Sequence, residues 1–362
     1  MRLATIKNGG TETAAIVTQK GVCPIRAVNK AKGTSWKTKM FDLILKEEIP
    51  LLTAWYNNGG KEELEEMPGV ILAEEAVYGP LYRTPQRIFG IGLNYVDHAG
   101  DLGESAPVGF PGSFYKPASC IIGPMDEIRI PELEEAKKTT AEAELGIILG
   151  KDCKCIDEED WEKYIAGYTA ILDMTEESIL RQNPRFLTIA KGFDTFFSFG
   201  PQLVTPDEVP DVLKLNVQTV HNGRVHAGND VSNMTHKPAR LVSLVSRLQG
   251  WKAGDILSTG TPRAVHIEDG DTAECRISGP DGFMMEPLIN PVVDMKKSIL
   301  VICQELFEED FDMFFRKKGN FNRPSVYFTY NRMSVRLNII FGVQLFAGVQ
   351  LVFDQQSKNE SY

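Results

Sequence analysis

Short apolar runs separated by glycine and proline recur between residues 86 and about 292, and they restrict the possible folds more than any other feature. Each run is too short for a long helix, and runs of this kind between turn residues are typical of β-strands. We therefore expect a sheet-rich α+β domain over residues 86–296. Helices are expected only at 158–165 and 238–248. The runs lie at residues 88–91, 121–122, 145–149, 168–172, 213–220 and 255–259.

The first 80 residues have a different pattern and indicate a small N-terminal α/β accessory domain. Two β-like pieces, 3–6 and 14–17, lie on either side of Gly9 and Gly10 and predict an opening hairpin. Apolar residues at helical spacing follow in 38–57. We expect Pro50 to split this helix in two.

Residues 297–362 differ again and are treated as a C-terminal extension of unknown role. Residues 297–318 could form an amphipathic helix. Residues 337–353 are almost entirely apolar, but a membrane helix needs about 20 such residues. Their alternating pattern fits β-structure as well as a membrane helix. No membrane association is expected.

The charge and the cysteines limit the partners and the compartment. A net charge of −10 argues against a nucleic-acid-binding protein, although a bound metal ion and a few lysines could still attract an anionic substrate. The six cysteines are scattered and contain no CxxC pair, and the first ten residues lack the apolar run of a signal peptide. We expect a cytoplasmic protein.

Three acidic residues suggest a metal site. Glu142 and Glu144 precede the apolar residues 145–149, and alternate residues of a strand share one face. Adjacent carboxylates repel unless a cation or a raised pKa compensates. Asp173 follows the apolar run 168–172 and is expected at a strand end, facing into a pocket. Three carboxylates would suit Mg²⁺ or Mn²⁺. A solvated strand face is the alternative explanation for the two glutamates.

A candidate general base lies in a glycine-rich turn. After the β-like run 88–91 the chain reads Gly92, Leu93 and Asn94 and reaches His98, with Asp101 three residues later. If this segment is helical, the aspartate could orient the imidazole and stabilise its protonated form. A purely structural histidine is the alternative.

A series of motifs in order resembles the fumarylacetoacetate hydrolase family from about residue 86 to 294. The motifs are Gly92-Leu93-Asn94-Tyr95 with His98, Phe114-x-Lys116-Pro117, Glu142-x-Glu144-Leu145, Gly167-Tyr168-Thr169 leading to Asp173, Lys191-Gly192-Phe193-Asp194-Thr195 with Gly200-Pro201, Asn222-Gly223, and 254–262 ending in Gly260-Thr261-Pro262. The resemblance implies a sheet-rich β-roll with a small N-terminal unit, and a homodimer.

The resemblance also implies a role for each matched residue. Glu142, Glu144 and Asp173 would hold one Mg²⁺ or Mn²⁺ ion, and His98 would be the base paired with Asp101. Lys191 would neutralise the negative charge that develops on the substrate. Substrate binding is expected from Gly260, Thr261 and Lys116, although Lys116 could equally be structural.

These roles together predict an enzyme that acts on small 2-oxo acids. The leading hypothesis is a hydrolase that cleaves a C–C bond of a diketo acid, such as an acylpyruvate or a diketo-deoxy sugar acid, through an enolate stabilised by the metal and a lysine. A decarboxylase, hydratase or isomerase using the same site is the alternative. A non-catalytic carboxylate-binding protein is a third possibility.

The sequence departs from the family pattern at two places. Asp101 stands where many relatives have glutamate, so its carboxylate is one methylene shorter; Glu104 is a less favoured substitute. Glu177 and Leu180 replace an arginine and a glutamine that follow the third ligand in many relatives. We therefore do not expect fumarylacetoacetate itself as the substrate. Arg181 or Arg185 could supply a positive charge instead, or lie on the solvated surface.

Overall fold

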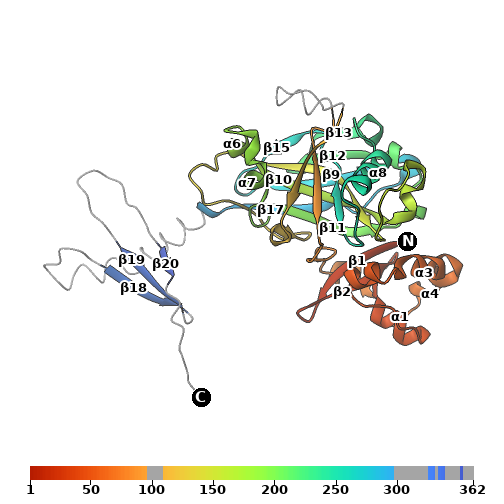
Figure 1. Ribbon diagram of the computed structural model, residues 1–362. Coiled ribbons are helices and arrows are strands. Elements are labelled where there is room, and N and C mark those ends of the chain that lie inside the picture. Colours follow the sequence, from red (N-terminus) through yellow and green to blue (C-terminus); the bar gives the residue numbers. More distant parts are fainter. Residues whose placement is uncertain (96–108, 297–324, 331–332, 339–350, 354–362) are drawn as a thin grey trace, which may run out of the picture. The chain divides into compact units, whose positions relative to one another are not determined.

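The computed structural model describes residues 1–95, 109–296, 325–330, 333–338 and 351–353. By its internal contacts the chain divides into two compact units, Met1–Ile299 and Leu300–Tyr362. The candidate site residues with a described position all lie in the first unit. Two β-sheets dominate this unit, which confirms the sheet-rich α+β fold (Figure 1).

The larger sheet runs through the whole first unit. Its strands lie in the order β4-β3-β2-β1-β11-β10-β9-β14-β5-β6, with β15 beside β9 and β7 beside β11. The bounds are β1 (Arg2–Asn8), β2 (Thr11–Val17), β3 (Gly21–Pro24), β4 (Ile71–Leu72), β5 (Ile88–Gly92), β6 (Gly112–Lys116), β7 (Ile121–Ile122), β9 (Thr139–Leu149), β10 (Ile165–Glu176), β11 (Phe197–Val204), β14 (Ile256–Ser258) and β15 (Ala264–His266).

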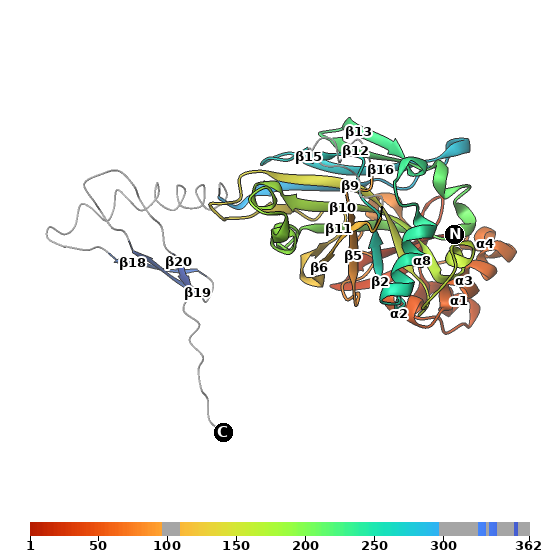
Figure 2. The ribbon, with the colours of Figure 1, turned by 45° about the horizontal axis from the view of Figure 1, so that its top comes forward.

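The smaller sheet packs against β9 and β10. Its order is β13-β12-β16-β17-β8, and Figure 2 shows β12, β13 and β16 stacked over β9. Every residue of β9 and β10 is buried, because these two strands are covered on both faces. The bounds are β8 (Ile128–Ile130), β12 (Asn216–His221), β13 (Arg224–Asp230), β16 (Thr272–Ser278) and β17 (Leu288–Asp294).

The N-terminal strands continue the larger sheet. The hairpin β1–β2 has the predicted position, and β1 pairs with β11 in antiparallel register, with Leu3 opposite Leu203. Helices α1, α3 and α4 gather beside this hairpin (Figure 1). A separate domain over residues 1–80 stays a prediction. The helices near the N-terminus are α1 (Ile25–Lys32), α2 (Met40–Leu45), α3 (Glu48–Trp55) and α4 (Lys61–Glu65), with a π-helical turn at Tyr56–Gly60.

Two of the expected helical segments form, and one of them is interrupted at a different residue from the one predicted. The break in 38–57 comes before Pro50, at Glu47, which has φ 52°. Pro50 lies in the first turn of α3, where its missing N–H is not needed for the helical hydrogen bonds. The helix expected at 158–165 is present over Glu158–Tyr164, and it is of the 3₁₀ type. The remaining α-helices of the described residues are α6 (Glu177–Leu180), α7 (Leu187–Lys191) and α8 (Pro238–Leu248), and α8 begins with Pro238 as expected.

The second unit contains a three-stranded sheet of β18 (Ser325–Tyr330), β19 (Met333–Asn338) and β20 (Leu351–Phe353). Leu337 pairs with Leu351, so both ends of the apolar segment 337–353 are in strands, as the β-alternative predicted. The proposed helix at 297–318 lies outside the described residues. Within the described residues, no helix is long and apolar enough to cross a membrane.

Candidate active site

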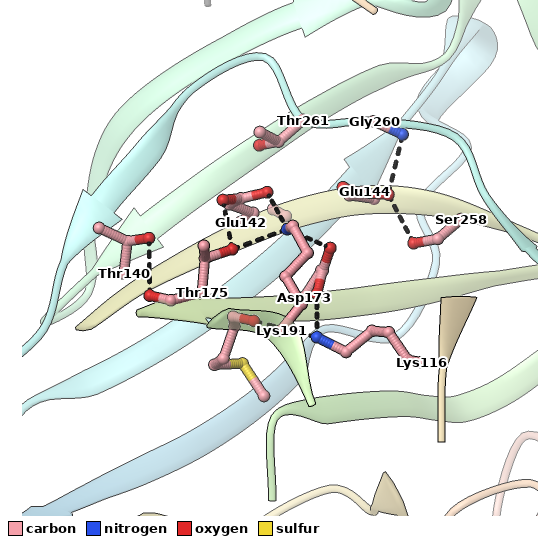
Figure 3. A network of polar contacts seen from close by, with 12 residues as sticks. Lys116, Thr140, Glu142, Glu144, Asp173, Thr175, Lys191, Ser258, Gly260 and Thr261 are labelled. Atoms are coloured by element: carbon pink, nitrogen blue, oxygen red, sulfur yellow. Dashed lines mark hydrogen bonds and ion pairs between the residues drawn. The ribbon is translucent and has the colours of Figure 1, made fainter. Parts of the chain in front are cut away.

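Two paired strands bring the three predicted carboxylates together. Asp173 of β10 lies directly opposite Glu142 of β9, and Glu144 lies two residues further along β9. Because alternate residues share one face of a strand, all three side chains project to the same side (Figure 3). One carboxylate oxygen from each lies within 4.8 Å of the others, and all three residues are buried. Burial excludes the alternative of a solvated strand face.

The position of Asp173 corrects one detail of the prediction. The residue was expected at the end of a strand, but β10 continues to Glu176. Asp173 therefore lies inside a long strand, and the carboxylate has no measurable exposure to solvent. It faces the site because of its register with Glu142, and not because the strand ends there.

Two lysines neutralise part of this negative charge. Lys191, the last residue of α7, places Nζ 2.7 Å from Oδ2 of Asp173 and 3.1 Å from Oε2 of Glu142. Lys116, the last residue of β6, pairs with Oδ1 of Asp173 and donates to the Met174 carbonyl at 3.0 Å. Three carboxylates and two ammonium groups leave one negative charge if all are ionised.

The surroundings of the carboxylates separate their pKa values. Burial alone would raise the pKa of Asp173, but Lys116 and Lys191 outweigh it and hold that pKa below its ordinary value. For Glu144, burial and then the neighbouring Asp173 and Glu142 raise the pKa to about 8. Burial would lower the pKa of Lys191, but the three carboxylates raise it, so this ammonium stays charged. Among the three carboxylates, Glu144 is therefore the one whose negative charge the two lysines stabilise least.

Glu144 is held by neutral donors from the last residue of β14 and from the turn that follows this strand. The Ser258 hydroxyl donates to Oε2 of Glu144, and the Gly260 N–H donates to the same oxygen at 2.8 Å. Gly260 has φ +96°, and an added Cβ would lie 2.8 Å from the Cβ of Asn94. The buried Asn94 amide donates to the Thr259 carbonyl at 2.8 Å and so fixes this turn.

The residues expected to bind substrate have protein partners in the structure. The Gly260 N–H is directed at Glu144, Lys116 is directed at Asp173, and the Thr261 hydroxyl donates to the Arg263 carbonyl at 3.3 Å. All three residues lie at the site or in its supporting turn. Their contact with a substrate stays a prediction.

His98, Asp101 and Glu104 lie outside the described residues. Asn94 lies just before this segment in the sequence. Its side chain accepts from the backbone N–H of His236 and donates to the His236 carbonyl, which fixes the backbone at this point. The roles of His98 as base and Asp101 as its partner therefore stay predictions.

The departure at residue 177 places a glutamate in an ion-pair cluster. Glu177 begins α6, accepts from Lys138 at 2.6 Å and also pairs with Arg181, one of the two arginines considered as a substitute cation. Arg185 is exposed. The charge of Arg181 is therefore already shared with Glu177.

Sequence reasoning missed two hydroxyl groups of the site. Thr175 bonds to both Glu142 and Lys191, and Ser258 bonds to Glu144. Thr175 could have been found, since it is two residues after Asp173 on the same strand face. Ser258 lies within the motif 254–262, but its contact with Glu144 could not be predicted, because the two residues are more than a hundred positions apart in the chain.

The donor set fits a hard divalent cation. Three clustered carboxylates offer oxygen ligands, which Mg²⁺ and Mn²⁺ prefer, and among the described residues only two lysines pair with these three groups. Glu142, Glu144 and Asp173 are the residues that could hold such an ion.

Comparison with known proteins identifies the family. The model of the fumarylacetoacetate (FAA) hydrolase C-terminal domain matches residues 87–293, which is more than half of the chain. The chain belongs to the fumarylacetoacetate hydrolase family. This confirms the resemblance inferred from the motifs, and the match contains the three carboxylates, both lysines and the Gly260 turn.

Individual relatives and solved structures are also similar to this chain in sequence and fold. An uncharacterised protein of Archaeoglobus fulgidus is 37% identical over 195 residues, covering 54% of this chain and 75% of its own. Maleylpyruvate hydrolase from Sphingobium sp. SYK-6, solved with manganese(II) and pyruvate, is 25% identical with a TM-score of 0.64, covering 81% of this chain and 99% of its own. A 2-hydroxyhepta-2,4-diene-1,7-dioate isomerase from Mycobacterium marinum is 29% identical with a TM-score of 0.54, covering 63% and 82%.

Proposed function

We propose that this protein is a metal-dependent hydrolase that cleaves a C–C bond in a small diketo acid, such as an acylpyruvate or a diketo-deoxy sugar acid. The observation that carries the proposal is the buried cluster of Glu142, Glu144 and Asp173 with Lys191 beside it. The related maleylpyruvate hydrolase, solved with manganese and pyruvate, supports both a divalent ion and a 2-oxo acid.

Each group of the site would have a distinct task. Glu142, Glu144 and Asp173 would hold Mg²⁺ or Mn²⁺, and the ion would supply Lewis-acid stabilisation of negative charge on the 2-oxo acid. Lys191 would add a fixed positive charge in a water-poor site, where such a charge is most effective. Lys116 keeps Asp173 ionised and oriented.

The proton transfers would fall to His98. As general base it would take a proton from water, whose oxygen then attacks the distal carbonyl of the diketo acid. The C–C bond next to the attacked carbonyl breaks and its electron pair forms the enolate of pyruvate or a similar 2-oxo acid. Protonation of that enolate gives the 2-oxo acid, and the other product is a carboxylic acid.

An isomerase, decarboxylase or hydratase acting at the same site is the second candidate. The isomerase from Mycobacterium marinum favours it, because that protein shares this fold at 29% identity. All these reactions need stabilisation of an enolate, so the carboxylates and Lys191 would serve each of them. A cytoplasmic location and a homodimer also stay predictions.

Product analysis separates these functions. The protein is incubated with acylpyruvates, diketo-deoxy sugar acids and oxaloacetate, each with Mn²⁺, with Mg²⁺ and with EDTA. Release of pyruvate and a carboxylic acid supports the hydrolase, CO₂ supports a decarboxylase, and an isomer of unchanged mass supports an isomerase. Metal-dependent turnover that is lost in His98→Ala rejects a non-catalytic binding protein. Turnover indifferent to EDTA rejects the metal mechanism.

A further inference from the structure

A single hydroxyl group joins the lysine of the site to one of its carboxylates. The Thr175 hydroxyl donates to Oε1 of Glu142 at 2.8 Å and accepts from Nζ of Lys191 at 2.7 Å (Figure 3). Thr175 is 2% exposed and lies on β10, two residues after Asp173. It therefore faces the same side of the strand as that carboxylate.

The direction of each hydrogen bond follows from the groups involved. An ammonium group has three protons and no acceptor, and the Lys191 protons are directed at Asp173, Glu142 and Thr175. The threonine oxygen must accept from the lysine, so its only proton is left for Glu142. A valine has nearly the same shape as threonine and can make neither contact.

This arrangement fixes the two oxygens of Glu142 separately. Oε1 accepts from Thr175 and Oε2 accepts from Lys191, so the plane of the carboxylate is set from both ends. The same hydroxyl holds the ammonium in place beside Asp173. Without it, Glu142 could rotate and Lys191 would keep only its two carboxylate partners.

We propose that Thr175 is a positioning residue that orients Glu142 toward the divalent ion and Lys191 toward the substrate. The inference rests on the proposed function and deepens it, since it assigns a role at the same site to a residue outside the predicted set. Partners of this kind, which touch a ligand residue and not the ion, typically change metal affinity or activity by about 10- to 100-fold. A purely structural hydroxyl would change stability without changing metal affinity.

The test compares Thr175→Val, Thr175→Ser and a matched control, Thr140→Val. Thr140 lies opposite Thr175 on β9 and is also buried, and its hydroxyl donates to the Thr175 carbonyl at 3.3 Å. Mn²⁺ affinity of the metal-stripped proteins is measured by electron paramagnetic resonance, and folding is checked by circular dichroism. We expect about a 10-fold weaker Mn²⁺ affinity in Thr175→Val. Thr175→Ser and Thr140→Val should bind Mn²⁺ as the unsubstituted protein does.

A second readout uses turnover at saturating Mn²⁺. In Thr175→Val, Lys191 loses one hydrogen-bond partner, so we expect kcat to fall by a larger factor than KM rises. In Thr175→Ser, which keeps the hydroxyl, kcat should equal that of the unsubstituted protein. If Thr175→Val does not fold, Thr175→Ala is compared with Thr175→Ser in the same two measurements. An unchanged Mn²⁺ affinity and kcat in the folded variant that lacks the hydroxyl would overturn the proposal, as would an equal loss in Thr140→Val.

Failure of the proposed function gives a different result. If the unsubstituted protein binds Mn²⁺ but turns over none of the 2-oxo acids, the hydrolase proposal fails while the Mn²⁺ affinities still decide the role of Thr175. A protein that binds neither Mn²⁺ nor Mg²⁺ would overturn both.

Discussion

Nζ of Lys191 lies 2.7 Å from Oδ2 of Asp173, and both side chains are withdrawn from solvent. Removal of this ammonium in Lys191→Met should lower kcat/KM for the preferred 2-oxo acid by about 10²- to 10³-fold, because a preorganised charge at the site is lost. Steady-state kinetics at saturating Mn²⁺ measure the effect. Lys61→Met, on the exposed surface of α4, is the control. Equal kinetics in both variants would contradict the role of Lys191.

Metal removal should abolish turnover and destabilise the first unit. Three carboxylates face two ammonium groups, so a divalent ion relieves the remaining repulsion. Titration of Mn²⁺ into metal-stripped protein should raise Tm, with about 2.7 kcal/mol of stabilisation at about 100 times Kd. Differential scanning calorimetry with and without EDTA checks this. A Tm that does not respond to Mn²⁺ or Mg²⁺ would count against the site.

Lys116→Met should mainly reduce stability. The substitution leaves the buried Asp173 with one ion-pair partner and the Met174 carbonyl without its lysine donor. Removal of one member of a buried ion pair typically costs about 3–5 kcal/mol. Urea unfolding of the metal-stripped protein measures the loss. A change within experimental error would show that Lys116 is not needed to compensate Asp173.

Gly260→Ala should weaken both stability and metal binding. The residue has φ +96°, and an added Cβ would approach the Asn94 Cβ at 2.8 Å and the Ile91 carbonyl oxygen at 3.1 Å. Backbone strain of this kind costs about 1–3 kcal/mol, and the required shift would move the N–H away from Glu144.

Gly270→Ala provides the matched control for this substitution. Gly270 has φ +83°, but nothing lies within 4 Å of its added Cβ. We expect this variant to show the backbone strain alone, with unchanged Mn²⁺ affinity. If the two variants bind Mn²⁺ equally well, the Gly260 N–H does not orient Glu144.

Glu177→Gln should destabilise the protein in a pH-dependent manner. Burial by itself would raise the pKa of Glu177, but the ion pairs with Lys138 and Arg181 outweigh it and hold the pKa below its ordinary value of 4.5. A lowered pKa contributes stability above pH 4.5 that is lost as the pH falls through the folded-state pKa. The difference in free energy of unfolding between the two proteins should therefore be largest at pH 7 and shrink below pH 4.5.

Urea unfolding at a series of pH values between 7 and 3 tests this dependence. Glu159→Gln, an exposed substitution in the 3₁₀ helix Glu158–Tyr164, is the control and should change little. A loss in Glu177→Gln that is constant over the whole range would show that the ion pairs do not stabilise the folded state.

Local patterns in the chain were enough to predict the strand-rich fold, the opening hairpin and the common face of Glu142 and Glu144. Strand periodicity depends only on neighbouring residues, so alternation places two side chains on one face wherever the strand lies. The helix 38–57 shows the limit of such reasoning. Pro50 was expected to interrupt it, but the backbone turns at Glu47 and the proline fits the first turn of α3.

The partners of the carboxylates depended on contacts between distant segments. Lys116 comes from β6 and Ser258 from β14, and no spacing in the chain relates either residue to the carboxylates of β9 and β10. Gly260 was expected to bind substrate, which stays a prediction, but the sequence did not show that the packing of its turn against Asn94 directs its N–H to Glu144. The reason is that a hydrogen bond requires two groups within about 3 Å, and that distance is set by how the strands pair and pack.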